Sequence, residues 1–273
     1  MRHVLGLSEW TVSDLDALFR VAGEYAQGRG PLVEGCAALF FPPSSFRTRV
    51  CFERGASLMG LQPITLPTET LDEPEALADV AGYLAQWADV IVVRHPRFTV
   101  LQELAAADVL PVVNAMTDVN HPCEVLSDLY ALSVNSDPVQ LRYLFVGVDG
   151  NISRAWQEAA GAFGITLVQC CPPNLASPGA VWAGDLREAV RSADVIITDG
   201  PGPHADAMAP YRVTADVLRE ADQGVRLLPC PPFVRGREVS ADAIASPAFV
   251  GHDFKASLLP VQQAVLATVL GAA

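Results

Sequence analysis

The sequence has few positive charges and no long uninterrupted apolar run. Among its 273 residues, 31 acidic side chains outnumber 18 basic ones, so the formal net charge is -13. Nucleic acids and anionic membrane surfaces attract basic patches, so this excess of acid argues against both as partners. No segment approaches the ~20 apolar residues of a membrane span, and the first ten residues hold no apolar run of signal-peptide length. We therefore expect a cytoplasmic protein that acts on small molecules.

Metal-ligand spacing and a dinucleotide fingerprint are also missing. The 6 cysteines are scattered without paired spacing, so we expect neither a zinc site nor a disulfide framework. Gly147-Val148-Asp149-Gly150 does not form the Gly-x-Gly-x-x-Gly pattern that binds a pyrophosphate. A nicotinamide-dependent enzyme is therefore the weakest of the possible interpretations.

Apolar runs alternate with amphipathic segments along most of the chain. This alternation predicts the α/β class, with parallel sheets covered on both faces by helices. Asn135 to Gln140 is polar and contains a proline, and the alternation restarts after it, which indicates a second domain. Ser8 is expected to cap a first helix from about Glu9 to Tyr25. The spacing of Lys255 to Leu270 predicts an amphipathic final helix.

One stretch carries most of the chemistry. Ala37 to Phe41 reads as a buried strand, two prolines end it, and Ser44 and Ser45 stand where they could cap a helix that begins near Phe46. Arginines follow within the first turn of that helix. Free N–H groups, the positive end of the helix dipole and guanidinium groups then converge, which suits a phosphate dianion. The alternative is a capped helix whose arginines are simply solvated.

Ser45-Phe46-Arg47-Thr48-Arg49 resembles the Ser-x-Arg-Thr-Arg phosphate-binding signature of the aspartate/ornithine carbamoyltransferase superfamily. Further matches follow in the order of that family: Val92-Val93-Arg94-His95-Pro96, Pro111-Val112-Val113-Asn114-Ala115, His121-Pro122-Cys123-Glu124, and the late segment Pro229-Cys230-Pro231-Pro232. The resemblance therefore covers nearly the whole chain.

The resemblance implies two α/β domains, each a parallel sheet flanked by helices, joined by interdomain helices. Residues 1–134 and 255–273 would bind carbamoyl phosphate, and residues 135–254 would bind an acceptor amino acid. It also implies a homotrimer with active sites between subunits. No metal or organic cofactor is needed for carbamoyl transfer, and the expected partners are small-molecule substrates.

Carbamoyl transfer requires the stabilisation of two oxyanions, the departing phosphate and the carbonyl oxygen. By resemblance, Ser45, Arg47 and Thr48 would hold the phosphate, whereas Thr48, Arg94 and His121 would donate hydrogen bonds to the carbonyl oxygen. Such preorganised donors are worth about 3 to 4 kcal/mol each. The alternatives are that Arg94 is a surface residue at a strand end and that His121 only caps its helix.

The donor site departs from the family in three places. Glu124 replaces the usual glutamine of the donor site, which adds a negative charge near the phosphate. Phe46 replaces the usual threonine of the signature and removes a hydroxyl from the phosphate-binding turn. The segment 61–79 contains no Lys or Arg, although family members often send a lysine from this region into a neighbouring active site. This acidic loop could equally be an ordinary solvated loop.

The acceptor site is less clearly marked. Asn151 and Arg154 occupy the place where the family binds the acceptor's α-carboxylate, although they could belong to an ordinary strand-to-helix turn. Thr198 and Asp199 resemble the start of an ornithine-specific loop whose remainder is replaced here, so Asp199 could pair with an ammonium group or be only a turn residue. We also expect the late segment to line the path of the amine, through the two residues Cys230 and Pro231.

The sequence thus favours an enzyme that carbamoylates an amino acid or small amine, with an ornithine-like diamino acid as the preferred acceptor. The altered positions leave a second hypothesis open: a non-catalytic homologue that binds a metabolite or regulates a partner.

Overall fold

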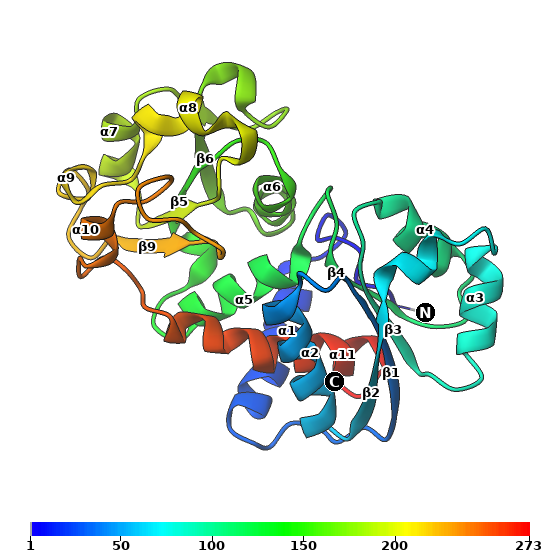
Figure 1. Cartoon of the computed structure of the whole chain (residues 1–273). Coiled ribbons are helices and arrows are strands. Elements are labelled where there is room, and N and C mark those ends of the chain that lie inside the picture. The colour runs from blue at the N-terminus through cyan, green and yellow to red at the C-terminus, as the bar shows by residue number, and fades with distance from the viewer. Residues whose placement is uncertain (1) are drawn as a thin grey trace. The chain divides into compact units, whose positions relative to one another are not determined.

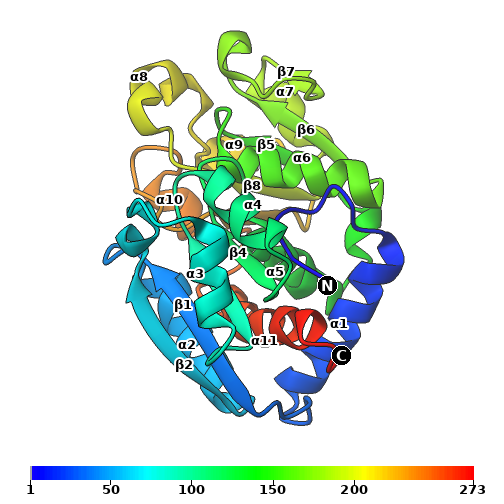
Figure 2. The same cartoon turned by 90° about the vertical axis from the view of Figure 1, so that its right-hand side faces the viewer.

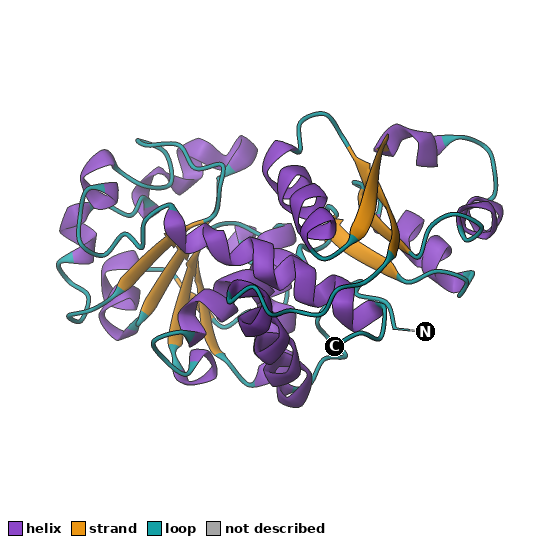
Figure 3. Cartoon of the chain, turned by 90° about the horizontal axis from the view of Figure 1, so that it is seen from below, coloured by secondary structure: helices purple, strands orange, loops and turns teal. Residues whose placement is uncertain are grey.

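The computed structural model describes residues 2–273 and contains two compact units. Unit 1 comprises the chain up to Ala131 together with Lys255–Ala273, and unit 2 comprises Leu132–Phe254 (Figure 1). Each unit has its own parallel sheet, and the two sets of strands are separate in Figure 3. The α/β class expected from the sequence is therefore confirmed.

Unit 1 is built on a four-stranded parallel sheet with the order β2-β1-β3-β4. Its strands are β1 (Gly35–Phe41), β2 (Leu61–Pro67), β3 (Val90–Arg94) and β4 (Val112–Met116). The two central strands are mainly apolar, and residues 37–41 and 90–93 are buried, as is typical of parallel sheets. Only the last residue of β3, Arg94, is both charged and partly exposed.

Helices cover both faces of this sheet. Their bounds are α1 (Val12–Ala26), α2 (Phe46–Leu58), α3 (Leu77–Leu84), α4 (Phe98–Ala106), α5 (Pro122–Ser133) and α11 (Leu258–Val269). α3 and α4 pack on a core that includes Ile91 and Leu101, whereas α11 lies beside α1 and α2 (Figure 2). The C-terminal helix therefore belongs to the same unit as the first helix of the chain.

Unit 2 contains a five-stranded parallel sheet with the order β7-β6-β5-β8-β9. Its strands are β5 (Arg142–Val146), β6 (Thr166–Cys170), β7 (Trp182–Ala183), β8 (Val195–Thr198) and β9 (Arg226–Pro229), and its helices are α6 (Asn151–Phe163), α7 (Leu186–Ala189), α8 (Ala205–Met208), α9 (Ala215–Leu218) and α10 (Ala241–Ile244). Tyr143 on β5 packs against Trp156 on α6, with ring centroids 5.1 Å apart. This contact fixes the first helix of the unit on its central strand.

The first helix begins later than the sequence indicates. α1 is capped by Thr11, not by Ser8, because Thr11 and Asp14 form a reciprocal pair of bonds. The Asp14 amide donates to Thr11 Oγ1 at 3.2 Å, and the Thr11 amide donates to Asp14 Oδ2 at 3.0 Å. Likewise α11 begins at Leu258 and not at Lys255, since a 3₁₀ turn over Asp253–Ser257 precedes it.

Among residues 2–273, no helix combines the length and the apolar character that crossing a bilayer would require.

The capping pair predicts a measurable loss of stability. Thr11→Ala removes the side-chain acceptor of the box, so the variant should lose about 1 kcal/mol and about 2 °C in Tm. Ser8→Ala is the matched control and should leave the Tm unchanged. Differential scanning calorimetry compares the two, and an equal loss in both variants would contradict the assignment of the cap.

Candidate functional site

The carboxyl ends of β1 and β3 form a switch point in the sheet of unit 1. From β1 the chain moves to β2 on one side, and β3 then pairs on the other side of β1. Ligands of open α/β sheets bind outside the carboxyl ends of the strands at such a point. The sequence places Ser45 and the start of α2 after β1, and Arg94 at the end of β3. Strand order alone therefore brings these groups to one edge.

The start of α2 presents a hydroxyl and a guanidinium group. Ser45 is buried at the N-cap position, but its side chain makes no capping bond, so that part of the sequence prediction is wrong. Its Oγ has no hydrogen-bond partner among residues 2–273. Arg47 is exposed, and its guanidinium lies over the Phe46 ring at 4.4 Å from the centroid. An anion at the helix N-terminus would give the buried hydroxyl the partner it lacks.

Arg94 and Thr48 meet at this edge. Arg94 Nη1 donates to Thr48 Oγ1 at 3.4 Å, and Thr48 is buried. Partial burial lowers the pKa of Arg94, an effect opposed by the negative charge of Glu124. A guanidinium removed in part from water is well placed to stabilise a developing oxyanion.

His121 lies just before α5 and is buried. Burial, with the charges of Arg94 and Lys255, lowers its pKa to about 4, although Glu124 acts in the opposite direction. Its Nδ1 has no hydrogen-bond partner among residues 2–273, and its Nε2 lies 3.9 Å from Glu124 Oε2. The imidazole is therefore neutral at pH 7, and a neutral imidazole can donate one N–H.

Glu124 and Asp128 share a lysine that the sequence analysis did not assign to the site. Lys255 Nζ donates to Glu124 Oε1 at 2.7 Å and also to Asp128 Oδ1. These partners are 131 and 127 positions away in the chain, so no local motif predicts the contact. Lys255 is the only lysine of the sequence, which is the one signal that could have singled it out.

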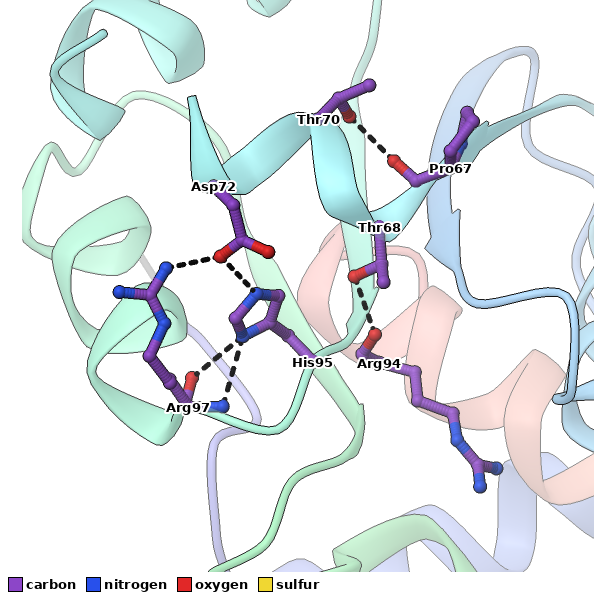
Figure 4. Close-up of polar contacts among 7 residues, drawn as sticks. All are labelled: Pro67, Thr68, Thr70, Asp72, Arg94, His95 and Arg97. Carbon is purple, nitrogen blue, oxygen red and sulfur yellow. Dashed lines mark hydrogen bonds and ion pairs between the residues drawn. The ribbon is translucent and has the colours of Figure 1, made fainter. Parts of the chain in front are cut away.

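The acidic loop is packed against the edge of its own sheet and is not simply solvated. Thr68 and Leu71 are buried, and Thr68 Oγ1 donates to the Arg94 carbonyl at 2.7 Å. Figure 4 shows Asp72 between His95 and Arg97, with the Arg94 side chain extending away from that group. His95 Nδ1 accepts the Arg97 amide at 3.0 Å, so its Nε2 carries the proton and donates to Asp72 at 3.1 Å.

The residues expected to bind the acceptor lie at the corresponding edge of the sheet in unit 2. β5 pairs β6 on one side and β8 on the other, so the switch point lies between β5 and β8. Asp199 directly follows β8, and Asn151 is the first residue of α6. Cys230 is buried and its amide donates to the Thr198 carbonyl at 2.8 Å, with Pro231 next in the chain. The topology thus gathers these predicted residues at one edge.

Arg154 is already engaged by an anionic partner. Its Nε and Nη2 donate to the two oxygens of Asp149 at 2.9 and 2.5 Å, and this bond lowers the pKa of Asp149. A substrate carboxylate would have to compete with Asp149 for the guanidinium.

Across residues 2–273, no three His, Cys, Asp or Glu side chains are grouped so that they could hold a metal ion.

Comparison with known proteins finds two family domains along the chain. The carbamoyl-phosphate-binding domain of aspartate/ornithine carbamoyltransferases matches residues 2–133, and the Asp/Orn-binding domain matches residues 139–269. The chain belongs to the aspartate/ornithine carbamoyltransferase family. The resemblance carried by the sequence motifs is thus confirmed.

Relatives of this family match the chain from end to end. The ornithine carbamoyltransferase of Geobacter metallireducens is 30% identical over 300 residues, which cover 98% of this chain and 99% of the relative. That of Rhodopseudomonas palustris is 32% identical over 301 residues, covering 99% and 97%. The structure of ornithine carbamoyltransferase from Pyrococcus furiosus superposes with a TM-score of 0.92 at 26% identity and covers 100% of this chain and 98% of its own.

The lowered pKa of His121 predicts a pH dependence of stability. Between about pH 6.5 and pH 4, the unfolded imidazole binds a proton that the folded one does not, so stability falls on acidification. His121→Asn has no imidazole, so its stability lacks this dependence on pH. From pH 7 to about pH 5, the wild type should therefore lose about 2 kcal/mol more than the variant. Urea unfolding across this range measures both, and a pH-independent difference between them would contradict the assignment.

The contacts of Asp72 predict that it restrains the acidic loop. Asp72→Ala removes the acceptor of both His95 and Arg97, so the amides of Thr68–Leu71 should exchange with solvent several-fold faster. Glu75→Ala removes an exposed carboxylate from the neighbouring stretch and serves as the matched control. Hydrogen exchange followed by mass spectrometry measures this segment, and unchanged exchange in Asp72→Ala would show that Leu71 and Thr68 hold the loop by themselves.

Proposed function

We propose that this chain transfers the carbamoyl group of carbamoyl phosphate to the amino group of an amino acid or small amine and releases phosphate. The observation that carries the proposal is the switch point of unit 1. There a buried hydroxyl without a partner among residues 2–273, a partly buried guanidinium and a neutral buried histidine come from three segments that meet at one sheet edge. This edge lies within the residues that match the carbamoyl-phosphate-binding domain.

The geometry suits the two charges that the reaction develops. Ser45, Arg47 and the first amides of α2 would hold the phosphate, because anions bind at helix N-termini. Thr48, Arg94 and His121 would donate to the carbonyl oxygen as the amine attacks the carbon. The new C–N bond forms as the C–O bond to phosphate breaks, and the departing phosphate is a base that can accept the amine's proton. A neutral His121 donates without adding a titratable positive charge at pH 7.

An ornithine-like diamino acid is the acceptor that we favour. Unit 2 matches the Asp/Orn-binding domain, and Asp199 at the end of β8 offers a carboxylate to an ammonium group. Asn151 at the start of α6 offers an amide to a carboxylate. Cys230 and Pro231 follow β9 at the same edge of the sheet. We further infer from the family a homotrimer that works in the cytoplasm, which light scattering and fractionation can examine.

The proposal predicts turnover that depends on Arg94. ¹³C-labelled carbamoyl phosphate incubated with ornithine, shorter diamino acids, aspartate and simple amines should give a ¹³C ureido signal with at least one of them. Arg94→Ala should lower that rate about 10²- to 10³-fold, as for the loss of an oxyanion donor. Arg54→Ala removes an exposed arginine from the far part of α2 and should keep the wild-type rate.

Each outcome of this assay has a consequence. Binding of carbamoyl phosphate without product from any amine would favour the non-catalytic alternative. If Arg94→Ala formed product at the wild-type rate, the reaction would not take place at the switch point of unit 1.

A further inference from the structure

The buried cluster around Glu124 contains two carboxylates and one ammonium group. Glu124 and Asp128 lie on α5, and Lys255 lies in the turn before α11. Both carboxylates are buried, at 7% and 2% exposure, and Lys255 is the donor to each of them. A charge buried in this way is strongly destabilising unless it is paired. The lysine is therefore a requirement of the two carboxylates and not an incidental contact.

The pKa values of the two carboxylates shift in opposite directions. Burial by itself would raise the pKa of Glu124, but Lys255 and His121 hold it below its usual range. The pKa of Asp128 is raised to about 6 by burial, with Glu124 acting in the same direction and Lys255 opposing. Glu124 therefore stays ionised to lower pH than Asp128 does.

The orientation of Glu124 follows from the same contact. Its Oε1 is held by Lys255 at 2.7 Å, which leaves Oε2 directed to the side of His121 at 3.9 Å. His121 and Arg94 are the groups to which the carbonyl oxygen of the donor has been assigned above. If these donors hold the carbonyl oxygen of a carbamoyl group, Oε2 would be the acceptor for the amino group on the same carbon.

We propose that Lys255 is a positioning residue of the donor site: it holds Glu124 ionised and turned so that Oε2 accepts a hydrogen bond from the amino group of the carbamoyl donor. The inference rests on the proposed function and deepens it. An ionised carboxylate only accepts hydrogen bonds, so the site selects a donor that carries N–H over an acyl phosphate that carries a methyl group. The lysine also offsets the negative charge that Glu124 adds near the phosphate.

The proposal predicts a loss that a second substitution reverses. Lys255→Met should weaken the binding of carbamoyl phosphate by roughly ten- to hundredfold, a range typical of lost supporting contacts. It should also reduce the preference for carbamoyl phosphate over acetyl phosphate. Glu124→Gln combined with Lys255→Met should recover most of both, because a neutral amide still offers an oxygen and needs no ammonium partner. Asp128, whose pKa burial already raises, can take up a proton when the lysine is absent. Lys255→Arg keeps the positive charge, so its affinity for carbamoyl phosphate should lie between those of the wild type and Lys255→Met.

The pH dependence of carbamoyl phosphate binding tests the positioning role, because a lysine that only stabilised the fold would leave it unchanged. The charged and titratable groups facing Glu124 are His121, Asp128 and Cys123 from its own helix or its start, Arg94 from β3, Cys51 from α2 and Lys255. Loss of Lys255 removes a cation beside Glu124, so the acid limb of carbamoyl phosphate binding should shift to higher pH. In the double variant, which has no carboxylate at position 124, this shift should be absent.

The single lysine makes the contact directly observable. Protein labelled with [ε-¹³C]lysine should give one lysine resonance, which carbamoyl phosphate should displace in the wild type and which Glu124→Gln should move in the free protein. Arg29→Met removes a surface charge from the same unit and should leave both the resonance and the affinity unchanged.

Four outcomes separate the inference from the function on which it rests. No binding of carbamoyl phosphate to the wild type would overturn the proposed function and this inference with it. Normal binding and unaltered selectivity in folded Lys255→Met would overturn the inference alone. If Lys255→Met does not fold, the double variant decides: recovery of folding without selectivity assigns Lys255 to stability only, whereas recovery of both supports the positioning role.

Discussion

The parallel alignment of the strands is the constraint on which the rest of the molecule depends. Because every strand of a parallel sheet runs in the same direction, every loop that follows a strand begins at the same edge. In unit 1, the order β2-β1-β3-β4 makes β1 and β3 neighbours whose following segments turn to opposite faces. Ser45 and Arg94, 49 positions apart in the sequence, reach one edge for that reason. The same rule gathers Asn151, Asp199 and Cys230 in unit 2.

Burial then determines the protonation of this edge. His121 loses its proton because an imidazolium would be desolvated, and Asp128 tends to keep its own for the same reason. The pKa of Glu124 is lowered despite its burial, because Lys255 is paired with it. Lys255 thus places one positive charge from the C-terminal part of the chain beside both buried carboxylates.

The fold could be predicted from the sequence because its signals are local. The apolar runs around Leu39 and Val92 and the prolines after Phe41 determine strands and turns without reference to distant residues. The position of Arg94 at a strand end was predictable in the same way. The start of α1 was misplaced because Ser8 and Thr11 are both good caps, and only the reciprocal bond with Asp14 decides between them.

What the sequence could not supply are contacts between distant segments. Nothing near Lys255 indicates that it reaches Glu124, and nothing near Asp72 indicates that it packs between His95 and Arg97. Asp149 and Arg154 are only 5 positions apart, but this spacing alone does not show whether Arg154 pairs with Asp149 or points toward a ligand. Each of these contacts depends on the chain being folded, and each changes how a candidate residue can act.

The most direct test of the central claim is isothermal titration of carbamoyl phosphate into the wild type and Arg47→Ala. If the switch point of unit 1 is a carbamoyl phosphate site, the wild type binds with micromolar affinity and Arg47→Ala does not bind. Absence of binding to the wild type, or equal binding by both proteins, would contradict the account, because the phosphate would then have no site at the start of α2.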